Sequence, residues 1–128
     1  MITGCKESGV FSHGQGSQVV VRGGSIAETE DGVCCQEGGH ADMQNVTITG
    51  CKDSGVLSLR QGKAVVRGGS IAKSKRGVCC QEGGHAEVRD VKIKGCKLYG
   101  LWCISGSLQH IGCNISNCGK GSTSGCRA

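Results

Sequence analysis

Three features of the sequence predict an all-β solenoid that coils about one axis. Residues 2–41 recur as residues 48–86, with about three-quarters of the positions identical. Inside this duplication, a glycine followed by an aliphatic residue returns about every 22 or 23 residues. The 128 residues include 24 glycines but only one Phe, one Tyr and one Trp, which disfavours a thick sandwich or bundle. These features predict a right-handed parallel β-helix solenoid of about six coils.

Each period contains three short β-prone stretches separated by glycine-rich bends, for example residues 56–59, 64–67 and 70–72. Stretches of about four residues leave no room for a helix, which needs about ten. Stacked coils would pair these strands in parallel at about 4.8 Å. We therefore predict three short strands per coil and a single domain over residues 1–128.

Period-two alternation from each glycine assigns side chains to the interior. The first inward set is Val10, Val33, Val56, Val78 and Leu101, and the second is Ser12, Cys35, Ser58, Cys80 and Cys103. Val46 and Val91 precede an isoleucine ladder at Ile26, Ile48, Ile71, Ile93 and Ile115. A third ladder is expected through Val20, Met43, Val65, Val88 and either His110 or Ile111. Small thiols are expected at a corner, in a column of Cys5, Cys51, Cys96 and Cys118.

The cadence Val46-Thr47-Ile48-Thr49-Gly50-Cys51, followed by Gly55-Val56 and then Ala64-Val65-Val66, resembles the right-handed parallel β-helix repeat proteins. These are similar to pectate lyases in architecture and to carbohydrate-binding and sugar-hydrolase repeats in pattern. The resemblance covers nearly the whole chain and implies the fold. It does not specify a function, because this architecture carries lyases, hydrolases, epimerases, adhesins and non-catalytic repeats.

The alternation that buries Val and Cys turns an apolar stripe outward, one residue per coil: Phe11, Cys34, Leu57, Cys79 and Trp102. Leu59 and Ile104 follow two residues later on the same face. Such a stripe needs a cover. It is a candidate binding surface for a partner protein, for a sugar stacked on Trp102, or for another segment of this chain. If the inward and outward assignments are reversed, the stripe is core.

A second candidate surface is a basic patch formed by Lys73, Lys75, Arg76, Lys92, Lys94 and Lys97. It could attract a carboxylate- or phosphate-bearing partner, or form a solvated rim, which is the favoured interpretation. The net charge of +5 is too mild to indicate nucleic acid, and no aromatic residues interleave with the basic ones. The sequence has no run of apolar residues long enough for membrane insertion.

No catalytic constellation is expected. The acidic residues fall mostly in bends and rarely at matching positions of neighbouring coils, so solvated turn charges are favoured over an acid–base pair. Ser12-His13-Gly14 is similar to the Gly-His-Gly of the polygalacturonases, but the other motifs of those enzymes are missing. Cys35 and His40 repeat as Cys80 and His85 two coils apart, which is too far for a shared metal ion. A cysteine nucleophile would require an exposed thiol at Cys34 or Cys79.

The sequence therefore predicts a non-enzymatic structural or protein-binding scaffold without cofactor, and a carbohydrate-binding or carbohydrate-cleaving module is the alternative. Partners are expected to be proteins, or further copies joined through uncapped coil ends, with carbohydrate as a further candidate. Eleven cysteines without C-x-x-C spacing favour reduced, buried thiols, with disulfides as the alternative. Because no leader segment is recognisable, an intracellular, reducing location is expected.

Overall fold

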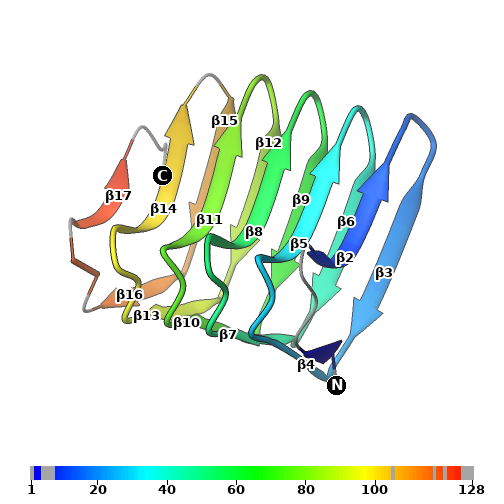
Figure 1. Ribbon diagram of the computed structural model, residues 1–128. Coiled ribbons are helices and arrows are strands. Elements are labelled where there is room, and N and C mark those ends of the chain that lie inside the picture. The colour runs from blue at the N-terminus through cyan, green and yellow to red at the C-terminus, as the bar shows by residue number, and fades with distance from the viewer. Residues whose placement is uncertain (1, 4–7, 105, 117, 120, 125–128) are drawn as a thin grey trace.

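The computed structural model describes residues 2–3, 8–104, 106–116, 118–119 and 121–124 (Figure 1). This part of the chain contains strands β1 to β17 and no helix. It therefore contains no helix long and apolar enough to cross a membrane.

The strands form three parallel sheets. Sheet A contains β1 (Ile2–Thr3), β4 (Ser25–Ala27), β7 (Thr47–Thr49), β10 (Ser70–Ala72), β13 (Lys92–Lys94) and β16 (Asn114–Ser116). Sheet B contains β2 (Ser8–His13), β5 (Asp31–Gln36), β8 (Ser54–Leu59), β11 (Arg76–Gln81), β14 (Tyr99–Ile104) and β17 (Gly121–Ser124). Sheet C contains β3 (Gln18–Arg22), β6 (His40–Gln44), β9 (Lys63–Arg67), β12 (His85–Arg89) and β15 (Ser107–Ile111).

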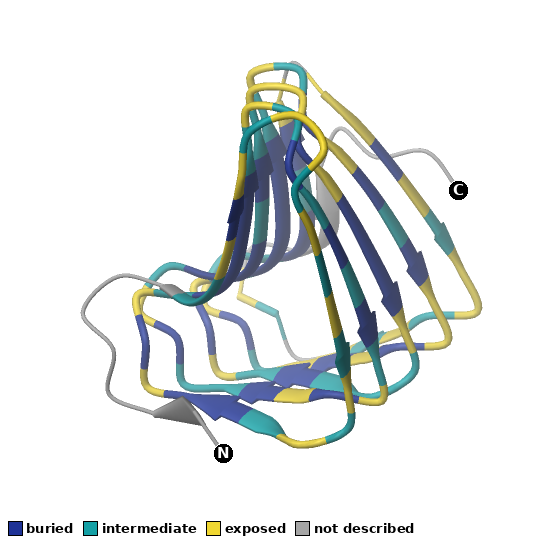
Figure 2. Ribbon diagram, turned by 90° about the vertical axis from the view of Figure 1, so that its right-hand side faces the viewer, coloured by how far each residue is buried: buried dark blue, intermediate teal, exposed yellow. Residues whose placement is uncertain are grey.

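The chain passes from sheet B to sheet C to sheet A and then begins the next coil, so consecutive strands of a sheet come from consecutive coils (Figure 1). There are five complete coils, β2–β4, β5–β7, β8–β10, β11–β13 and β14–β16, with β1 before them and β17 after them. This confirms the predicted parallel β-helix with three strands per coil, and the predicted six coils are close to the observed number. Figure 2, a view along the coil axis, shows the buried residues lining the inside of all three sheets.

Two of the predicted inward ladders are confirmed by register and burial. The first ladder pairs from strand to strand across sheet B and is fully buried at Val33, Val56, Val78 and Leu101. The isoleucines pair in the same way across sheet A, and those from Ile26 to Ile93 are fully buried. Val and Ile suit this narrow interior because their branched side chains pack well on a pleated surface.

The third ladder was predicted one residue out of place in two coils. In sheet C, Met43 pairs with Val21 and Val66, not with Val20 and Val65. The ladder then continues through Val88 to His110. Val20 points outward and is 47% exposed. Runs of two or three valines in these strands hide the alternation, so the sequence alone does not reveal which valine faces the core.

The corner between sheets A and B holds small side chains, as expected. Thr29, Cys51, Ser74 and Cys96 are buried there in successive coils, and the Thr29 hydroxyl lies 3.5 Å from the Cys51 sulfur. Cys118 continues the column and is half-buried. Cys5 lies outside the described residues. The alternation of hydroxyl and thiol follows the double-coil period of the duplication.

The glycine near the start of β5, β8 and β11 allows a close approach between consecutive coils. A Cβ on Gly32 would lie 2.5 Å from the carbonyl oxygen of Gly55 and 2.7 Å from Cγ2 of Ile48. Gly77 meets the same two obstacles, the carbonyl oxygen of Gly100 at 2.4 Å and Cγ2 of Ile93 at 2.8 Å. Any side chain there would separate the coils or displace the isoleucine ladder, which explains the repeated glycine.

Gly32→Ala is expected to lower the free energy of unfolding by about 2–4 kcal/mol, because backbone has to move to admit the methyl group. The control is Gly23→Ala, where φ is +72° and nothing lies within 4 Å. That change should cost only about 1 kcal/mol of backbone strain. Urea denaturation followed by circular dichroism measures both, and equal losses would contradict this explanation of the repeat.

Candidate functional site

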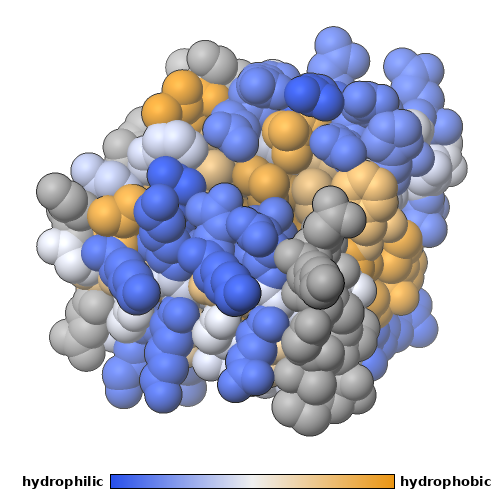
Figure 3. All heavy atoms as spheres, in the orientation of Figure 1, coloured by the Kyte–Doolittle hydropathy of each residue, from blue (hydrophilic) through white to orange (hydrophobic). Residues whose placement is uncertain are grey.

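The outward stripe predicted from the sequence forms one row on the outer face of sheet B. Its members pair with one another in register across five consecutive strands, β2, β5, β8, β11 and β14. They are Phe11, Cys34, Leu57, Cys79 and Trp102. A second row follows two residues later and consists of His13, Gln36, Leu59, Gln81 and Ile104. Figure 3, which faces this side, shows hydrophobic side chains gathered in a band bordered by hydrophilic ones.

Exposure along the stripe is uneven. Phe11 is 50% exposed, and Ile104 in the adjoining row is 49% exposed. Cys34 and Cys79 are only 6% and 0% exposed, although their strand positions turn them away from the core ladder. The surface open to a partner is therefore formed by the large side chains of the two rows, and the cysteines lie sealed between them.

Burial removes the candidate cysteine nucleophile. Desolvation raises the pKa of the Cys79 thiol to about 12, with Asp53 and Asp31 adding to the effect and Arg76 opposing it. A thiol with this pKa is protonated at neutral pH and is a poor nucleophile. Cys34 is also buried. Both cysteines point away from the core ladder as predicted, but neither offers the exposed thiol that a cysteine nucleophile would require.

Arg76 connects the apolar stripe to the charged turn beside it. Its guanidinium lies 4.2 Å from the ring centroid of Trp102, and its Nη1 is 3.0 Å from Oδ1 of Asp53. A cation over an aromatic face contributes about 0.5–2 kcal/mol, depending on desolvation. Arg76 therefore holds the Trp102 ring in place and occupies part of its face.

The carboxylates of Asp31 and Asp53, from successive coils, lie near each other where β5 and β8 begin. Desolvation raises the pKa of Asp31 to about 6, opposed by a hydrogen bond that the Ser54 N–H donates to its Oδ1 at 3.2 Å. The negative charges of Asp53 and Glu30 raise it further. The sequence did not reveal the proximity of Asp31 and Asp53, because Asp31 directly precedes its glycine anchor whereas Asp53 stands two residues before the next. The turn that leads into β8 is one residue longer than the turn that leads into β5.

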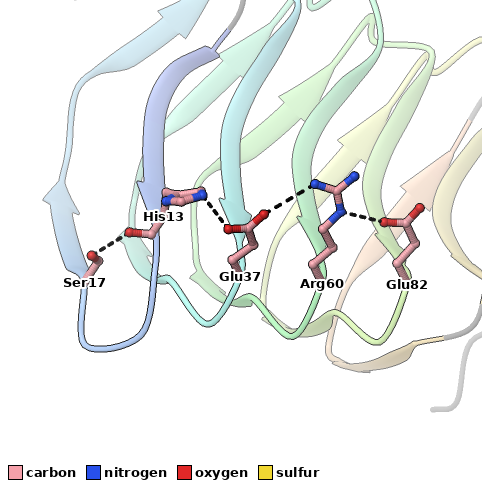
Figure 4. A network of polar contacts seen from close by, with 5 residues as sticks. All are labelled: His13, Ser17, Glu37, Arg60 and Glu82. Atoms are coloured by element: carbon pink, nitrogen blue, oxygen red, sulfur yellow. Dashed lines mark hydrogen bonds and ion pairs between the residues drawn. The ribbon is translucent and has the colours of Figure 1, made fainter.

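The opposite rim of sheet B, where its strands lead to sheet C, carries a chain of polar and charged side chains (Figure 4). Nε2 of His13 lies 2.6 Å from Glu37, whose other oxygen is 3.4 Å from Nη1 of Arg60. Nε of Arg60 is 3.1 Å from Glu82. These groups are exposed, so each pair adds little stability. Their effect is to hold a polar border along the apolar rows.

The predicted basic patch loses one member in the structure. Arg76 is engaged by Asp53 and Trp102. The others are exposed and come from neighbouring coils, as shown by backbone hydrogen bonds from Lys73 N to Lys94 O at 3.1 Å and from Lys97 N to Ser74 O at 2.9 Å. Among the described residues, no ion pair involves any of the five: Lys73, Lys75, Lys92, Lys94 and Lys97.

The repeated Cys and His pairs do not meet. Cys35 and Cys80 belong to the core, whereas His40 and His85 begin strands of sheet C and are not buried. Within the described ranges, no three His, Cys, Asp or Glu side chains gather as metal ligands. Two surface hollows lie elsewhere. One of about 360 Å³ is lined by Gln44, Asn45, Arg67, Gly68 and Asp90, and one of about 320 Å³ by Lys63, His85, Ala86, Glu87, Ser107 and Gln109.

The elevated pKa of Asp31 predicts a pH-dependent cost to stability. Because its pKa rises from 3.8 to about 6 on folding, the neutral carboxyl is preferred in the folded state, and stability is lost as pH rises between these values. Asp31→Asn should therefore stabilise the protein at pH 7 by about 1 kcal/mol, after allowance for solvent screening, and by much less at pH 4. Urea denaturation at both pH values tests this, with Glu30→Gln as the matched control. An equal effect of Asp31→Asn at both pH values would contradict it.

The comparisons with known proteins agree with this architecture. A family model described as a right-handed β-helix region matches residues 2–127. No curated protein and no solved structure matches the sequence at a significant level. With three parallel sheets, stacked inward ladders and a family match over almost its whole length, the chain belongs to the right-handed β-helix family.

Proposed function

We propose that this protein is a non-enzymatic scaffold that binds a polypeptide partner on the outer face of sheet B. The observation that carries the proposal is the pair of in-register rows with exposed Phe11 and Ile104 at opposite ends. Leu57, Leu59 and Trp102 are half-buried between or beside them. Large apolar side chains interspersed with polar ones and surrounded by a polar border are typical of a protein interface.

Several features favour a polypeptide over a sugar on this face. The Arg76 guanidinium already occupies part of the Trp102 ring, so a sugar would have to displace it or use what remains. Phe11 and Ile104 offer exposed apolar area, and the polar neighbours His13 and Gln81 lie beside them, His13 stacked on Phe11 and Gln81 paired with Ile104. Large anchors separated by sealed small residues match the uneven distribution of binding energy in protein interfaces.

Peptides selected from a random display library against the wild-type protein provide the test. Phe11→Ser combined with Ile104→Ser should weaken their binding by at least about tenfold, since truncating such anchors removes most of the affinity. The matched control is Ile111→Ser, an apolar residue that is 59% exposed on sheet C. Unchanged binding by the double variant, or an equal loss in the control, would contradict the proposal.

One observation favours a second candidate, a module that cleaves carbohydrate. Asp31, with its pKa raised to about 6, lies near Asp53, whose carboxylate accepts a hydrogen bond from Arg76. A carboxyl with a raised pKa beside a second carboxylate is the arrangement of a general acid and its partner base. The same pair would also arise wherever two turn carboxylates stack in successive coils.

Hydrolysis assays on neutral and acidic polysaccharides between pH 4 and pH 7 separate the two candidates. The scaffold proposal expects no reducing ends above background at any pH. Turnover that is abolished by Asp31→Asn and by Asp53→Asn, but kept by Glu30→Gln, would overturn it in favour of the enzyme.

A further inference from the structure

Charge is reversed between the two copies of the duplication at one corner of the solenoid. The turn Ser25-Ile26-Ala27-Glu28-Thr29-Glu30-Asp31-Gly32 returns as Ser70-Ile71-Ala72-Lys73-Ser74-Lys75-Arg76-Gly77. All three acidic residues of the first turn become basic in the second, while the aliphatic and glycine positions are kept. The corner between sheets A and B therefore has an acidic turn leading into β5 and a basic turn leading into β11.

The charged groups at the tips of these turns form no ion pair within the described part of the chain. Glu28, Glu30, Lys73 and Lys75 are all exposed. Among the ion pairs of the described residues, none includes any of the four. The two turns lie two coils apart, about 9.6 Å, with the turn into β8 between them. These charges are thus exposed and can meet charges of another molecule.

The apolar row on sheet B is arranged about the same centre. Leu57 on β8 is its middle residue, with Cys34 and Cys79 on either side and the aromatic residues Phe11 and Trp102 at the ends. The adjoining row has Leu59 in the middle and Gln36 and Gln81 beside it. A two-fold rotation through β8 therefore exchanges side chains of like kind along the first row, and exchanges Gln36 with Gln81 in the second. At the ends of the second row it places His13 opposite Ile104.

The same rotation exchanges side chains of opposite charge at the corner. With the axis parallel to the strands, β5 of one molecule faces β11 of the other, and their solenoid axes run antiparallel. Glu28 and Glu30 would then face Lys73 and Lys75, twice over by symmetry. On the opposite rim, Glu37 would face Glu82, but both already contact Arg60.

We infer that the partner of the sheet B face is a second copy of this chain, bound antiparallel about a two-fold axis at β8. The inference rests on the proposed function, because the apolar rows supply the affinity. The reversed charges fix the orientation, since electrostatic complementarity contributes more to specificity than to affinity.

The size of the face sets the strength expected of this dimer. Five strands of six residues cover an area that would bury about 1,000 Å² in total, the lower end of specific interfaces. We therefore expect a reversible dimer with a dissociation constant of about 1–100 µM at low salt. High salt should weaken it, because exposed charges are screened.

Sedimentation equilibrium of the full chain under reducing conditions, from about 1 µM to about 500 µM, is the test. Wild type should show a monomer–dimer equilibrium. Glu28→Lys with Glu30→Lys should weaken dimerisation at least about tenfold, and so should Lys73→Glu with Lys75→Glu, because each places like charges opposite each other. Mixing these two variants should restore a one-to-one dimer. Combining all four substitutions in one chain should also restore it, whereas a non-specific loss of folding would not be rescued.

Three outcomes would overturn the inference: a wild-type monomer at every concentration, dimers insensitive to all the charge changes, or open-ended polymers. A wild-type monomer that still binds the selected peptides through Phe11 and Ile104 would refute the dimer alone and leave the proposed function standing. Peptide binding indifferent to Phe11 and Ile104 would refute the proposed function. Urea denaturation of each variant checks that it is folded.

Discussion

The close approach of consecutive coils at the start of sheet B is the constraint on which the rest of the structure depends. Gly32, Gly55 and Gly77 bring the carbonyl of the next coil to within 2.4–2.8 Å of where a Cβ would lie. This contact seats the isoleucine ladder against the glycines and brings each strand into register with the last. The one-residue-per-coil rows on the outer face follow from that register, so the binding surface depends on residues that have no side chain.

The duplication adds a two-coil period to the single-coil period of the ladders. Alternate coils differ at matched positions, so the hydroxyls of Thr29 and Ser74 alternate with the thiols of Cys51 and Cys96 along the buried corner. On the outer face, the same double period puts small cysteines between larger residues. The inside tolerates this variation because thiols, hydroxyls and short aliphatic side chains have similar volumes. The outside can therefore diverge between copies while the core stays nearly constant, and the charged turns show the largest divergence.

Periodicity predicted the fold because each ladder repeats about every 22 or 23 residues and each glycine anchor is visible. It is least reliable where several valines are adjacent: periodicity predicts Val20 and Val65 in the inward ladder, whereas Val21 and Val66 occupy it. Periodicity gave the direction of the outward stripe but not its exposure, because the burial of Cys34 and Cys79 depends on side chains from other coils. The approach of Asp31 to Asp53, and of Arg76 to Trp102, depends on turn geometry that varies by one residue between coils.

The central claim is that a polypeptide partner covers the outer face of sheet B when it binds. Trp102, the single tryptophan of the chain, lies on that face and reports its accessibility. Acrylamide quenching of its fluorescence, measured at dilute and at concentrated protein, tests the claim most directly. We predict that Trp102 becomes less accessible as the protein concentration rises. Equal quenching at all concentrations, with and without the selected peptides, would contradict the account.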